Sequence, residues 1–349
     1  MSKYDYNLIV IGAGSAGLVS SYIAAAVKSK VALIEKHKMG GDCLNYGCVP
    51  SKAIIQSAKI LSYAKNSTDF GIKKMSYEFE FSDVMDRVHR IIKSIEPHDS
   101  VERYTKLGVD CFQGEAKVLS PHKVQINNKV ITCRSIIIAT GASPLVPKIP
   151  GLDEIDYLTS ENIWNLKKLP KNFLIIGGGP IGMEMAQAFS RLGSNVTVVE
   201  MAPKVLLKED DDVIDFVNEN FKKENINILT NHKAVEVKGN NLICEVNNEK
   251  VTLEFDEIFI ALGRKANIDG FGLDKLKIHI RGNGTIEANQ FLQTNYPNIY
   301  VCGDVTGPYQ FTHSAAHQAW YASVNALFSP IKKFKVDYSI IPWATFTDP

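Results

Sequence analysis

The feature that most constrains the fold is a glycine spacing, G-x-G-x-x-G, that occurs twice in the sequence. Its first copy is Gly12, Gly14 and Gly17, directly after the apolar run at residues 7–11. Eighteen residues after the last of these glycines, Glu35 closes a second apolar run. This order predicts a strand, a tight turn, a helix and a second strand, with a pyrophosphate at the helix N-terminus and the carboxylate on a ribose hydroxyl.

The second copy is Gly177, Gly179 and Gly182, after the apolar run at residues 173–176. Glu200 again follows the last glycine by eighteen residues and ends an apolar run. One such loop is weak support for a nucleotide site, but two loops with matching acidic residues are strong support. We therefore expect an α/β protein with two Rossmann-like, three-layer dinucleotide-binding domains that hold two dinucleotides at once.

Composition excludes several other classes of protein. The 349 residues are 45% hydrophobic and carry a net charge of about +1, with no basic run, which argues against nucleic-acid or anionic-lipid partners. Residues 6–27 contain no charge and are long enough to resemble a membrane span, but the first glycine loop explains them better. The start of the chain lacks the basic region of a signal peptide. We expect a cytoplasmic protein without a membrane span.

Six cysteines are present, and only Cys43 and Cys48 form a pattern. They lie in Cys-Leu-Asn-Tyr-Gly-Cys, just before a helix that Pro50 is expected to open. The remaining four are expected to be small buried hydrophobic residues: Cys111, Cys133, Cys244 and Cys302. Such a pattern does not indicate a disulfide-dense secreted scaffold.

The Cys43–Cys48 pair favours redox chemistry. A thiol at a helix N-terminus has its thiolate stabilised by unpaired backbone N–H groups and the helix dipole. Two thiols separated by four residues can close a small disulfide, and Gly47 helps the chain to bend. The alternative is half of a zinc site, but zinc needs about four ligands and no second Cys/His pair of suitable spacing lies nearby.

Two further residues gain meaning only from their neighbours. Lys52 follows Cys48 by four residues, about one helical turn, and Glu184 follows Gly182 by two residues. On spacing alone, Lys52 could be an ordinary surface lysine and Glu184 an ordinary glutamate in the first turn of a helix.

The rest of the sequence predicts alternating elements. Helical spacing covers residues 81–108, with an interruption at Pro97, and residues 313–328. Prolines and glycines crowd residues 141–151, which indicates a linker. Short apolar strands are expected at residues 111–118, 123–126, 129–132, 135–139, 226–229, 234–237, 242–246, 258–261 and 299–301.

Residues 40–52, Gly-Gly-Asp-Cys-Leu-Asn-Tyr-Gly-Cys-Val-Pro-Ser-Lys, resemble the redox-active segment of the pyridine nucleotide-disulfide oxidoreductases, a family that includes dihydrolipoamide dehydrogenase, glutathione reductase and mercuric reductase. Asp42 departs from the threonine common there and favours a mercuric-reductase-like branch. Three further stretches match the family in the right order: Ile138-Ala139-Thr140-Gly141, Ala261-Leu262-Gly263-Arg264 and Cys302-Gly303-Asp304.

This resemblance implies an NAD domain inserted in an FAD domain. The implied boundaries are 1–147 and 267–341 for the two parts of the FAD domain and 148–266 for the NAD(H) domain. FAD would contact Gly12, Gly14, Gly17, Glu35, Gly41, Lys52, Ala116, Thr140, Gly141, Gly303 and Asp304. The nicotinamide cofactor would contact Gly177, Gly179, Gly182, Glu200, Gly263 and Arg264.

The resemblance also implies catalytic roles. Cys48 would contact the flavin, and Cys43 would exchange with a small-molecule disulfide, thiol or related substrate. Lys52 would pair with Glu184 beside flavin N5. Electrons would pass from NAD(P)H through flavin to the Cys43–Cys48 disulfide bond and then to the substrate, or in reverse.

The sequence after Glu200 predicts NADH in preference to NADPH. A carboxylate accepts hydrogen bonds from the ribose 2′-OH but repels a 2′-phosphate. Met201 and Ala202 follow, and Lys204 is the only nearby cation.

Residues 340–346 look like the start of a strand, so we expect the chain to be a fragment in which residues 342–349 begin a C-terminal dimerisation domain. Family members use that domain to form a homodimer and to supply a His–Glu acid–base pair. The fragment would turn over poorly and is a candidate monomer. His313 and His317 are expected to be ordinary helix residues.

Two alternatives remain open. One is an NADH oxidase or quinone-type flavoreductase that uses flavin without dithiol exchange, and the other is a non-enzymatic redox sensor. The sequence leaves the physiological substrate undetermined among lipoamide, glutathione, a metal ion and small thiols.

Overall fold

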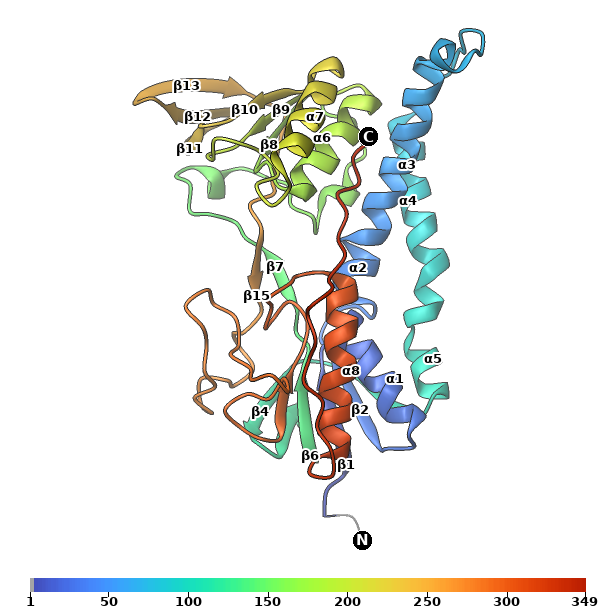
Figure 1. Ribbon diagram of the computed structural model, residues 1–349, viewed down its shortest axis with the longest axis vertical. Coiled ribbons are helices and arrows are strands. Elements are labelled where there is room, and N and C mark those ends of the chain that lie inside the picture. Colours follow the sequence, from blue (N-terminus) through green and yellow to red (C-terminus); the bar gives the residue numbers. More distant parts are fainter. Residues whose placement is uncertain (1–2) are drawn as a thin grey trace. The chain divides into compact units, whose positions relative to one another are not determined.

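The computed structural model describes residues 3–349, which form two compact units (Figure 1). Unit 1 contains the described part of Met1–Asn45 together with Lys93–Ser143 and Lys265–Pro342. Unit 2 contains Tyr46–Ile92, Pro144–Arg264 and Trp343–Pro349. The cofactor-domain boundaries expected from the sequence remain a prediction, because a compact unit is defined by packing and not by what it binds.

Unit 1 is built on a mainly parallel sheet in the order β3-β2-β1-β6, with β16 pairing on the far side of β6. Three of its strands, at residues 6–11, 31–35 and 299–301, are short, apolar and mostly buried, as expected in a parallel sheet covered on both faces. The parallel strands are β1 (Tyr6–Ile11), β2 (Val31–Glu35), β3 (Val109–Gln113), β6 (Lys129–Ile138) and β16 (Ile299–Val301).

Strand β6 is longer than expected. The sequence predicted separate strands at 129–132 and 135–139, but the structure has one continuous strand. Its first residues pair antiparallel with β5 (Lys123–Ile126), which in turn pairs with β4 (Ala116–Ser120), and its later residues pair parallel with β1. The polar residues Thr132 and Arg134 hid this continuity, because they interrupt the apolar run without breaking the strand.

The sheet of unit 1 separates two apolar layers. Leu8 and Val10 on one face of β1 pack in a core with alanines of α1 (Ser15–Ala26) and α8 (Thr312–Phe328), while Ile9 and Ile11 on the other face pack in a separate core. This alternation follows from the two-residue period of a strand. Figure 1 shows α1 and α8 side by side on one face, and the short α5 (Val101–Lys106) precedes β3.

Unit 2 repeats the same strand order. Its parallel sheet runs β10-β9-β8-β14, which corresponds to β3-β2-β1-β6 in unit 1 and to the order of the Rossmann fold. The elements are β8 (Asn172–Ile176), β9 (Asn195–Val199), β10 (Asn227–Leu229) and β14 (Glu257–Ile260), with helices α6 (Pro180–Leu192) and α7 (Asp211–Lys223). The two Rossmann-like arrangements predicted from the glycine spacing are confirmed.

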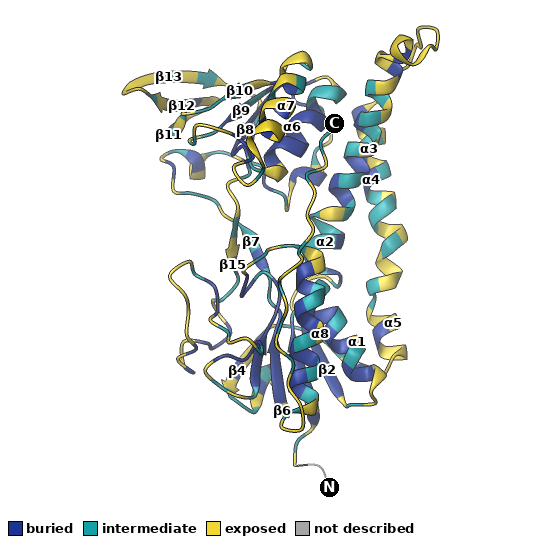
Figure 2. Cartoon of the chain, in the orientation of Figure 1, coloured by how far each residue is buried: buried dark blue, intermediate teal, exposed yellow. Residues whose placement is uncertain are grey.

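A second, antiparallel sheet in unit 2 comprises β11 (Lys233–Lys238), β12 (Asn241–Val246) and β13 (Glu249–Glu254). The sequence predicted the first two strands but missed β13. This strand is short of apolar residues because it lies at an edge of the sheet, and Figure 2 shows it largely exposed. The strands of the parallel sheet are mostly buried in the same view.

Two long helices also belong mainly to unit 2. Helix α3 (Cys48–Lys65) begins at Cys48 itself, two residues before the expected start at Pro50. Helix α4 (Phe81–Ile95) ends where the 3₁₀ turn η2 (Glu96–Asp99) carries Pro97, as the sequence predicted. Short 3₁₀ turns occur at Ser67–Phe70, Leu152–Glu154 and Ile163–Asn165.

Two of the five places where the chain passes from one unit to the other lie in paired strands, β7 (Ala142–Pro144) and β15 (Arg264–Ala266). Within the described chain, residues 340–349 contain no strand, so the strand expected at 340–346 is wrong. Trp343–Pro349 instead makes side-chain and backbone contacts with helices of unit 2. Residues 6–27 form β1, the glycine loop and α1, and no helix among residues 3–349 is long and apolar enough to cross a bilayer.

Candidate functional site

The first glycine loop is tightly packed at two of its glycines and open at the third. Gly12 has φ +100°, and a Cβ there would lie 2.4 Å from the carbonyl oxygen of Ala139. A Cβ on Gly17 would lie 1.7 Å from the carbonyl oxygen of Gly12. At Gly14, by contrast, the nearest heavy atom to an added Cβ is 3.8 Å away. The loop therefore turns sharply, packs closely on the sheet and leaves room for a Cβ at Gly14, in ordinary contact with Gly41.

The second loop repeats this arrangement. Gly177 has φ +113°, and its Cβ would meet the carbonyl oxygen of Ala261 at 2.5 Å. A Cβ on Gly182 would lie 2.0 Å from the carbonyl oxygen of Gly177. Among the residues that the structure describes, no heavy atom lies within 4 Å of a Cβ built on Gly179. The two loops, far apart in the sequence, thus have the same pair of steric constraints, and in both the middle glycine would accept a Cβ without a clash.

The two acidic residues are fixed in matching ways. Glu35 Oε2 accepts a hydrogen bond from the Ala13 N–H at 2.7 Å, and its Oε1 accepts one from His37 at 2.8 Å. Glu200 Oε2 accepts from the Gly178 N–H at 2.7 Å, and its Oε1 accepts from Ala202 at 2.8 Å. Each carboxylate is held against its own glycine loop and retains lone pairs for further donors.

Each loop leads into a helix whose N-terminus suits an anion. In the described structure no side chain caps α1 at Gly14 or α6 at Gly179, and neither helix has an acidic residue in its first turn. The first backbone N–H groups of such a helix need an acceptor, and the helix dipole favours a negative one. A clash-free middle glycine, a helix start without a side-chain cap and a nearby fixed carboxylate together fit a dinucleotide at each loop.

The matched family stretches lie beside these loops. Ala139 and Ala261 supply the carbonyl oxygens that face Gly12 and Gly177. In unit 1, Thr140 exchanges two hydrogen bonds with Asn267: its hydroxyl donates to the Asn267 carbonyl at 2.7 Å, and its own carbonyl accepts from the Asn267 amide at 3.0 Å. The neighbouring Gly141 has φ +66° and, in unit 2, Gly263 has φ +102°, with Arg264 beginning β15.

Cys43 lies in a short helix that the sequence did not predict, α2 (Gly41–Asn45). Gly41 has φ +57°, and a Cβ on it would lie 2.5 Å from the Cα of Gly14, so the two backbones touch. The Asn45 amide donates to the carbonyl of Gly41 at 2.8 Å and stabilises this single turn. The half-buried Cys43 is thereby held two residues from the point where α2 meets the first glycine loop.

Cys48 is the first residue of α3 and is exposed, with Gly47 preceding the helix. The expected placement of a thiol at a helix N-terminus is confirmed. Just before it, the carbonyl of Tyr46 accepts a hydrogen bond from Trp164 Nε1 at 2.9 Å. This contact fixes the chain where α3 begins.

Lys52 and Glu184 form an ion pair although 132 residues separate them. The Lys52 Nζ lies 2.9 Å from Glu184 Oε2. The Glu184 side chain is only 7% exposed, whereas that of Lys52 is 37% exposed. Helix α6 presents the carboxylate and α3 presents the ammonium group one turn after Cys48, so unit 2 brings together three of the four predicted catalytic residues.

The remaining predicted site residues lie in unit 1. Ala116 is the buried first residue of β4. Gly303 and Asp304 follow β16, and the Gly303 N–H donates to the buried side-chain oxygen of Gln318 on α8 at 2.6 Å. Gln318 and Asn267 were not predicted, because an amide in a helix or loop carries no motif of its own.

Three of the other four cysteines, Cys133, Cys244 and Cys302, are buried as predicted, whereas Cys111 is only half-buried. Burial raises the pKa of both Cys133 and Cys302 to about 12 and that of Cys244 to about 11. Burial also raises the pKa of Cys111. A raised pKa lowers the thiolate fraction near neutral pH, and therefore lowers reactivity.

The two α8 histidines also match their ordinary expectation. His313 stacks on Phe311 with ring centroids 5.3 Å apart, and His317 Nε2 lies 2.7 Å from the carbonyl oxygen of Asp337. In the described chain no group of three or more His, Cys, Asp and Glu side chains forms a metal-binding cluster.

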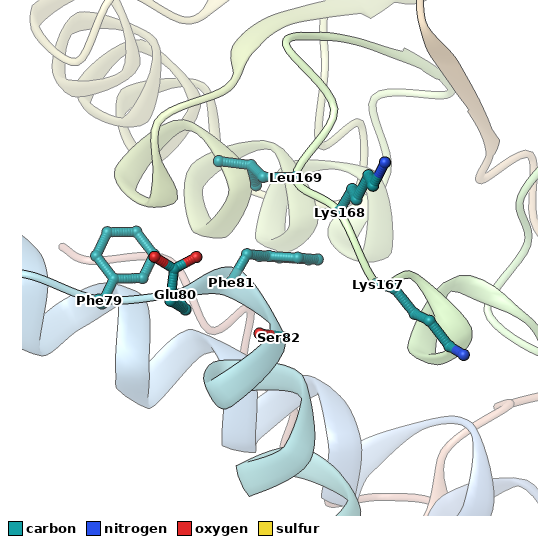
Figure 3. Close-up of a pocket in the computed structure, with 7 residues that line it drawn as sticks. All are labelled: Phe79, Glu80, Phe81, Ser82, Lys167, Lys168 and Leu169. Atoms are coloured by element: carbon teal, nitrogen blue, oxygen red, sulfur yellow. The ribbon is translucent and has the colours of Figure 1, made fainter.

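A pocket of about 320 Å³ in unit 2 lies elsewhere (Figure 3). Figure 3 shows the amino groups of both lysines pointing away from the Glu80 carboxylate, so they do not form a joint binding site with it. None of the predicted site residues lines this pocket. Its lining consists of Phe79, Glu80, Phe81, Ser82, Lys167, Lys168 and Leu169.

Two Rossmann-like sheets with paired glycine loops define an α/β protein of the dinucleotide-binding class. The pyridine nucleotide-disulphide oxidoreductase family model matches residues 6–319, and the chain belongs to that family. The family resemblance inferred from residues 40–52 is confirmed. Proteins of this family depend on FAD and use NAD(P)H.

Relatives carry two different names. Mercuric reductase of Staphylococcus aureus is 32% identical over 349 residues, and that of Bacillus cereus is 34% identical over 351; each match covers 99% of this chain. Dihydrolipoyl dehydrogenase of Acholeplasma laidlawii is 35% identical over 323 residues, 91% of this chain and 95% of that protein. The chain spans 63% and 55% of the two mercuric reductases.

Among solved structures, the chain is similar to the HOCl-induced flavoprotein disulfide reductase RclA from Escherichia coli. Its Cu(II) complex superposes with a TM-score of 0.81 at 26% identity, covering 93% of this chain and 72% of that one. A structure with the same RclA name matches at a TM-score of 0.82 and 27% identity.

Proposed function

We propose that this protein is an NAD(P)H-dependent FAD enzyme that transfers electrons to or from a disulfide or related substrate through Cys43 and Cys48. The observation that carries the proposal is the Lys52–Glu184 ion pair, which lies one helical turn from a cysteine at the start of α3. An ion pair that only stabilised the packing of α3 on α6 could lie anywhere along the two helices. A thiol-based redox site requires a charged group close to its sulfur, as here.

FAD would lie at the first loop, on Gly12, Gly14, Gly17 and Glu35, in a domain formed by residues 1–147 and 267–341. Gly41, Lys52, Ala116, Thr140, Gly141, Gly303 and Asp304 would complete that site. When bound, FAD supplies the hydride acceptor that a pair of thiols lacks. The nicotinamide cofactor would lie at the second loop, in residues 148–266, with Gly263 and Arg264 at its border.

Cys43 and Cys48 would perform the exchange. The Cys43 thiolate attacks a substrate disulfide, whose S–S bond breaks and releases one substrate thiolate. The Cys48 thiolate then attacks Cys43 in the mixed disulfide, which releases the second substrate thiolate and forms the Cys43–Cys48 disulfide. Two electrons have passed to the substrate, and the protein is left oxidised.

Lys52 and Glu184 would set the charge beside the thiol. A cation near the redox groups favours the more negative, reduced form of its neighbours, and the buried Glu184 carboxylate keeps that cation in one position. The pair therefore tunes redox balance without itself forming a bond to the substrate.

The names of the relatives suggest two substrate classes for the same thiols. A dihydrolipoyl substrate would use disulfide exchange, whereas a mercuric ion would bind directly to soft thiolate ligands.

The cysteine usage of the chain supports a cytoplasmic location. A homodimer remains an expectation of the family resemblance.

Anaerobic titration of the FAD-loaded protein with NADH tests the proposed function. The protein should take up about two hydride equivalents, one for the flavin and one for the disulfide, and develop the long-wavelength absorbance of a thiolate against a flavin. Uptake of a single equivalent would favour the flavin-only oxidase or quinone-type alternative. Reduction without turnover on any disulfide, quinone or oxygen would favour a redox sensor.

NADH should be preferred to NADPH by about tenfold or more in kcat/KM, because Glu200 would lose a hydrogen bond and meet a like charge at a 2′-phosphate. Its carboxylate is fixed by two backbone donors, and the neighbouring Lys204 is paired with Asp211 at 2.8 Å. Steady-state rates with both cofactors check this preference. The Glu200→Gln variant should narrow it, and a wild-type preference for NADPH would contradict the cofactor assignment.

A further inference from the structure

Phe346 contacts both members of the Lys52–Glu184 pair. Its backbone N–H donates to Glu184 Oε1 at 3.0 Å, while Glu184 Oε2 accepts from Lys52 at 2.9 Å. The Lys52 Nζ lies 4.2 Å from the centroid of the Phe346 ring, within the range of a cation–π contact. One residue thus binds the carboxylate through its backbone and the ammonium group through its side chain.

The helices present matching faces to this segment. On α6, Gln187 and Arg191 follow Glu184 by three and seven residues, so all three lie on one side of that helix. Lys52 and Lys59 are seven residues apart on α3 and likewise share a face. Polar side chains on both helices point at the same short stretch of chain.

Asp348 anchors the stretch two residues beyond Phe346. Its carboxylate accepts from Arg191 at 2.8 Å and lies 3.0 Å from Lys59 Nζ. Its backbone N–H donates to the Gln187 side-chain oxygen at 2.8 Å, and its carbonyl accepts from the Gln187 amide at 2.8 Å. Burial opposes ionisation of the Asp348 carboxyl, but hydrogen bonds from Arg191 and Lys59 outweigh it and lower the pKa.

Arg191 makes this anchor specific. Its side chain is only 9% exposed, and it bridges Asp348 to Glu224 at the end of α7, with a 2.7 Å contact to Glu224 Oε1. A guanidinium group with two carboxylate partners holds a planar, directional arrangement that a lysine cannot reproduce. At the other end of the segment, Trp343 and Thr345 donate to Glu209.

We propose that Phe346 is a positioning residue for the Lys52–Glu184 pair, held in place by the Asp348–Arg191 anchor. Without the Phe346 N–H, one oxygen of a buried carboxylate loses its partner, and without the ring the ammonium group is more open to water. The consequence at the flavin rests on the proposed function, but the positioning itself is a property of unit 2. Figure 1 shows the marked C-terminus beside α6, consistent with these contacts.

Lysine acylation of the cofactor-free protein tests the positioning. The protein is treated with acetic anhydride, and acylation of Lys52 is followed by mass spectrometry. Phe346→Ala should raise the acylation rate about three- to fivefold, which corresponds to the free energy of a partly exposed cation–π contact. Phe346→Tyr should restore the wild-type rate. Phe216→Ala removes an exposed ring from α7 and should leave Lys52 unchanged.

The anchor gives an independent variant if Phe346→Ala fails to fold. Asp348→Asn keeps the shape of the side chain but weakens both cation contacts, so Lys52 acylation should rise in the same direction. Asp215→Asn, an exposed position on α7, is the matched control. Unchanged acylation of Lys52 in both Phe346→Ala and Asp348→Asn would overturn the proposal.

Loading the same variants with FAD separates this proposal from the proposed function. If the wild-type protein binds no FAD, the proposed function fails while the acylation result still stands. In loaded protein, Phe346→Ala should shift the flavin midpoint potential to a more negative value, because the cation is no longer held, and Phe346→Tyr should reverse the shift. If Phe346→Ala raises Lys52 acylation but leaves the potential unchanged, the positioning stands and the placement of the pair beside the flavin fails.

Discussion

Replacing Cys43 by serine should lower single-turnover reduction of oxidised lipoamide on the order of a thousandfold, because the covalent exchange step is removed. The NADH-reduced, FAD-loaded protein is mixed with the disulfide, and thiol release is followed. Hydride uptake in the anaerobic titration should fall from about two equivalents to about one, since the flavin alone remains to be reduced.

Cys48→Ser should still release the first substrate thiolate but leave Cys43 in the mixed disulfide, so release of the second thiolate should fall on the order of a thousandfold. The two variants should also differ in their visible absorbance. Cys43→Ser keeps the exposed Cys48 at the start of α3, whereas Cys48→Ser removes the thiol proposed to contact the flavin. Long-wavelength absorbance should therefore survive only in Cys43→Ser. Cys111→Ser is the matched control, because Cys111 is half-buried like Cys43 and has a raised pKa. Full activity of Cys43→Ser would contradict the dithiol mechanism.

The parts of the site that the sequence predicted are those fixed by local spacing. A turn that needs Gly12, a close contact that needs Gly17 and a strand that ends at Glu35 all lie within one short unit of chain. The positive φ of Gly12 and the contact between Gly17 and Gly12 are limits set within a few neighbouring residues, so a single sequence carries their signal, whereas the contact of Gly12 with Ala139 is not local. The placement of Cys48 at a helix start was readable for the same reason.

Contacts between distant segments could not be predicted in this way. Nothing in the spacing of Lys52 or Glu184 shows that α3 and α6 pack together, and only the family resemblance suggested their pairing. The sequence predicts a strand over residues 340–346, but the backbone N–H of Phe346 donates to Glu184 and its ring contacts Lys52. Hydrophobic periodicity and strand propensity indicate which side chains of a segment can be buried. They do not indicate which distant residues the segment will contact.

Replacing Gly179 by alanine should weaken NADH binding about tenfold or more while the protein stays folded and keeps its FAD. The added methyl group meets no described heavy atom within 4 Å, and the backbone at Gly179 has φ −77°, which alanine adopts readily. The free space is where a pyrophosphate would approach the N-terminus of α6, so the cost falls on the ligand and not on the fold. Fluorescence titration with NADH and the flavin content of the purified protein are the measurements.

Gly14→Ala is the matched variant in the first loop, with φ −78° and a nearest contact of 3.8 Å, and it should lose FAD while keeping its fold. Gly182→Ala tests packing instead, because its Cβ would lie 2.0 Å from the Gly177 carbonyl oxygen and should destabilise the protein by about 3 kcal/mol or more. Loss of FAD in Gly179→Ala with loss of NADH binding in Gly14→Ala would reverse the two assignments. Unchanged binding of both cofactors in both variants would mean that neither loop holds a dinucleotide, although both have the backbone geometry that one requires.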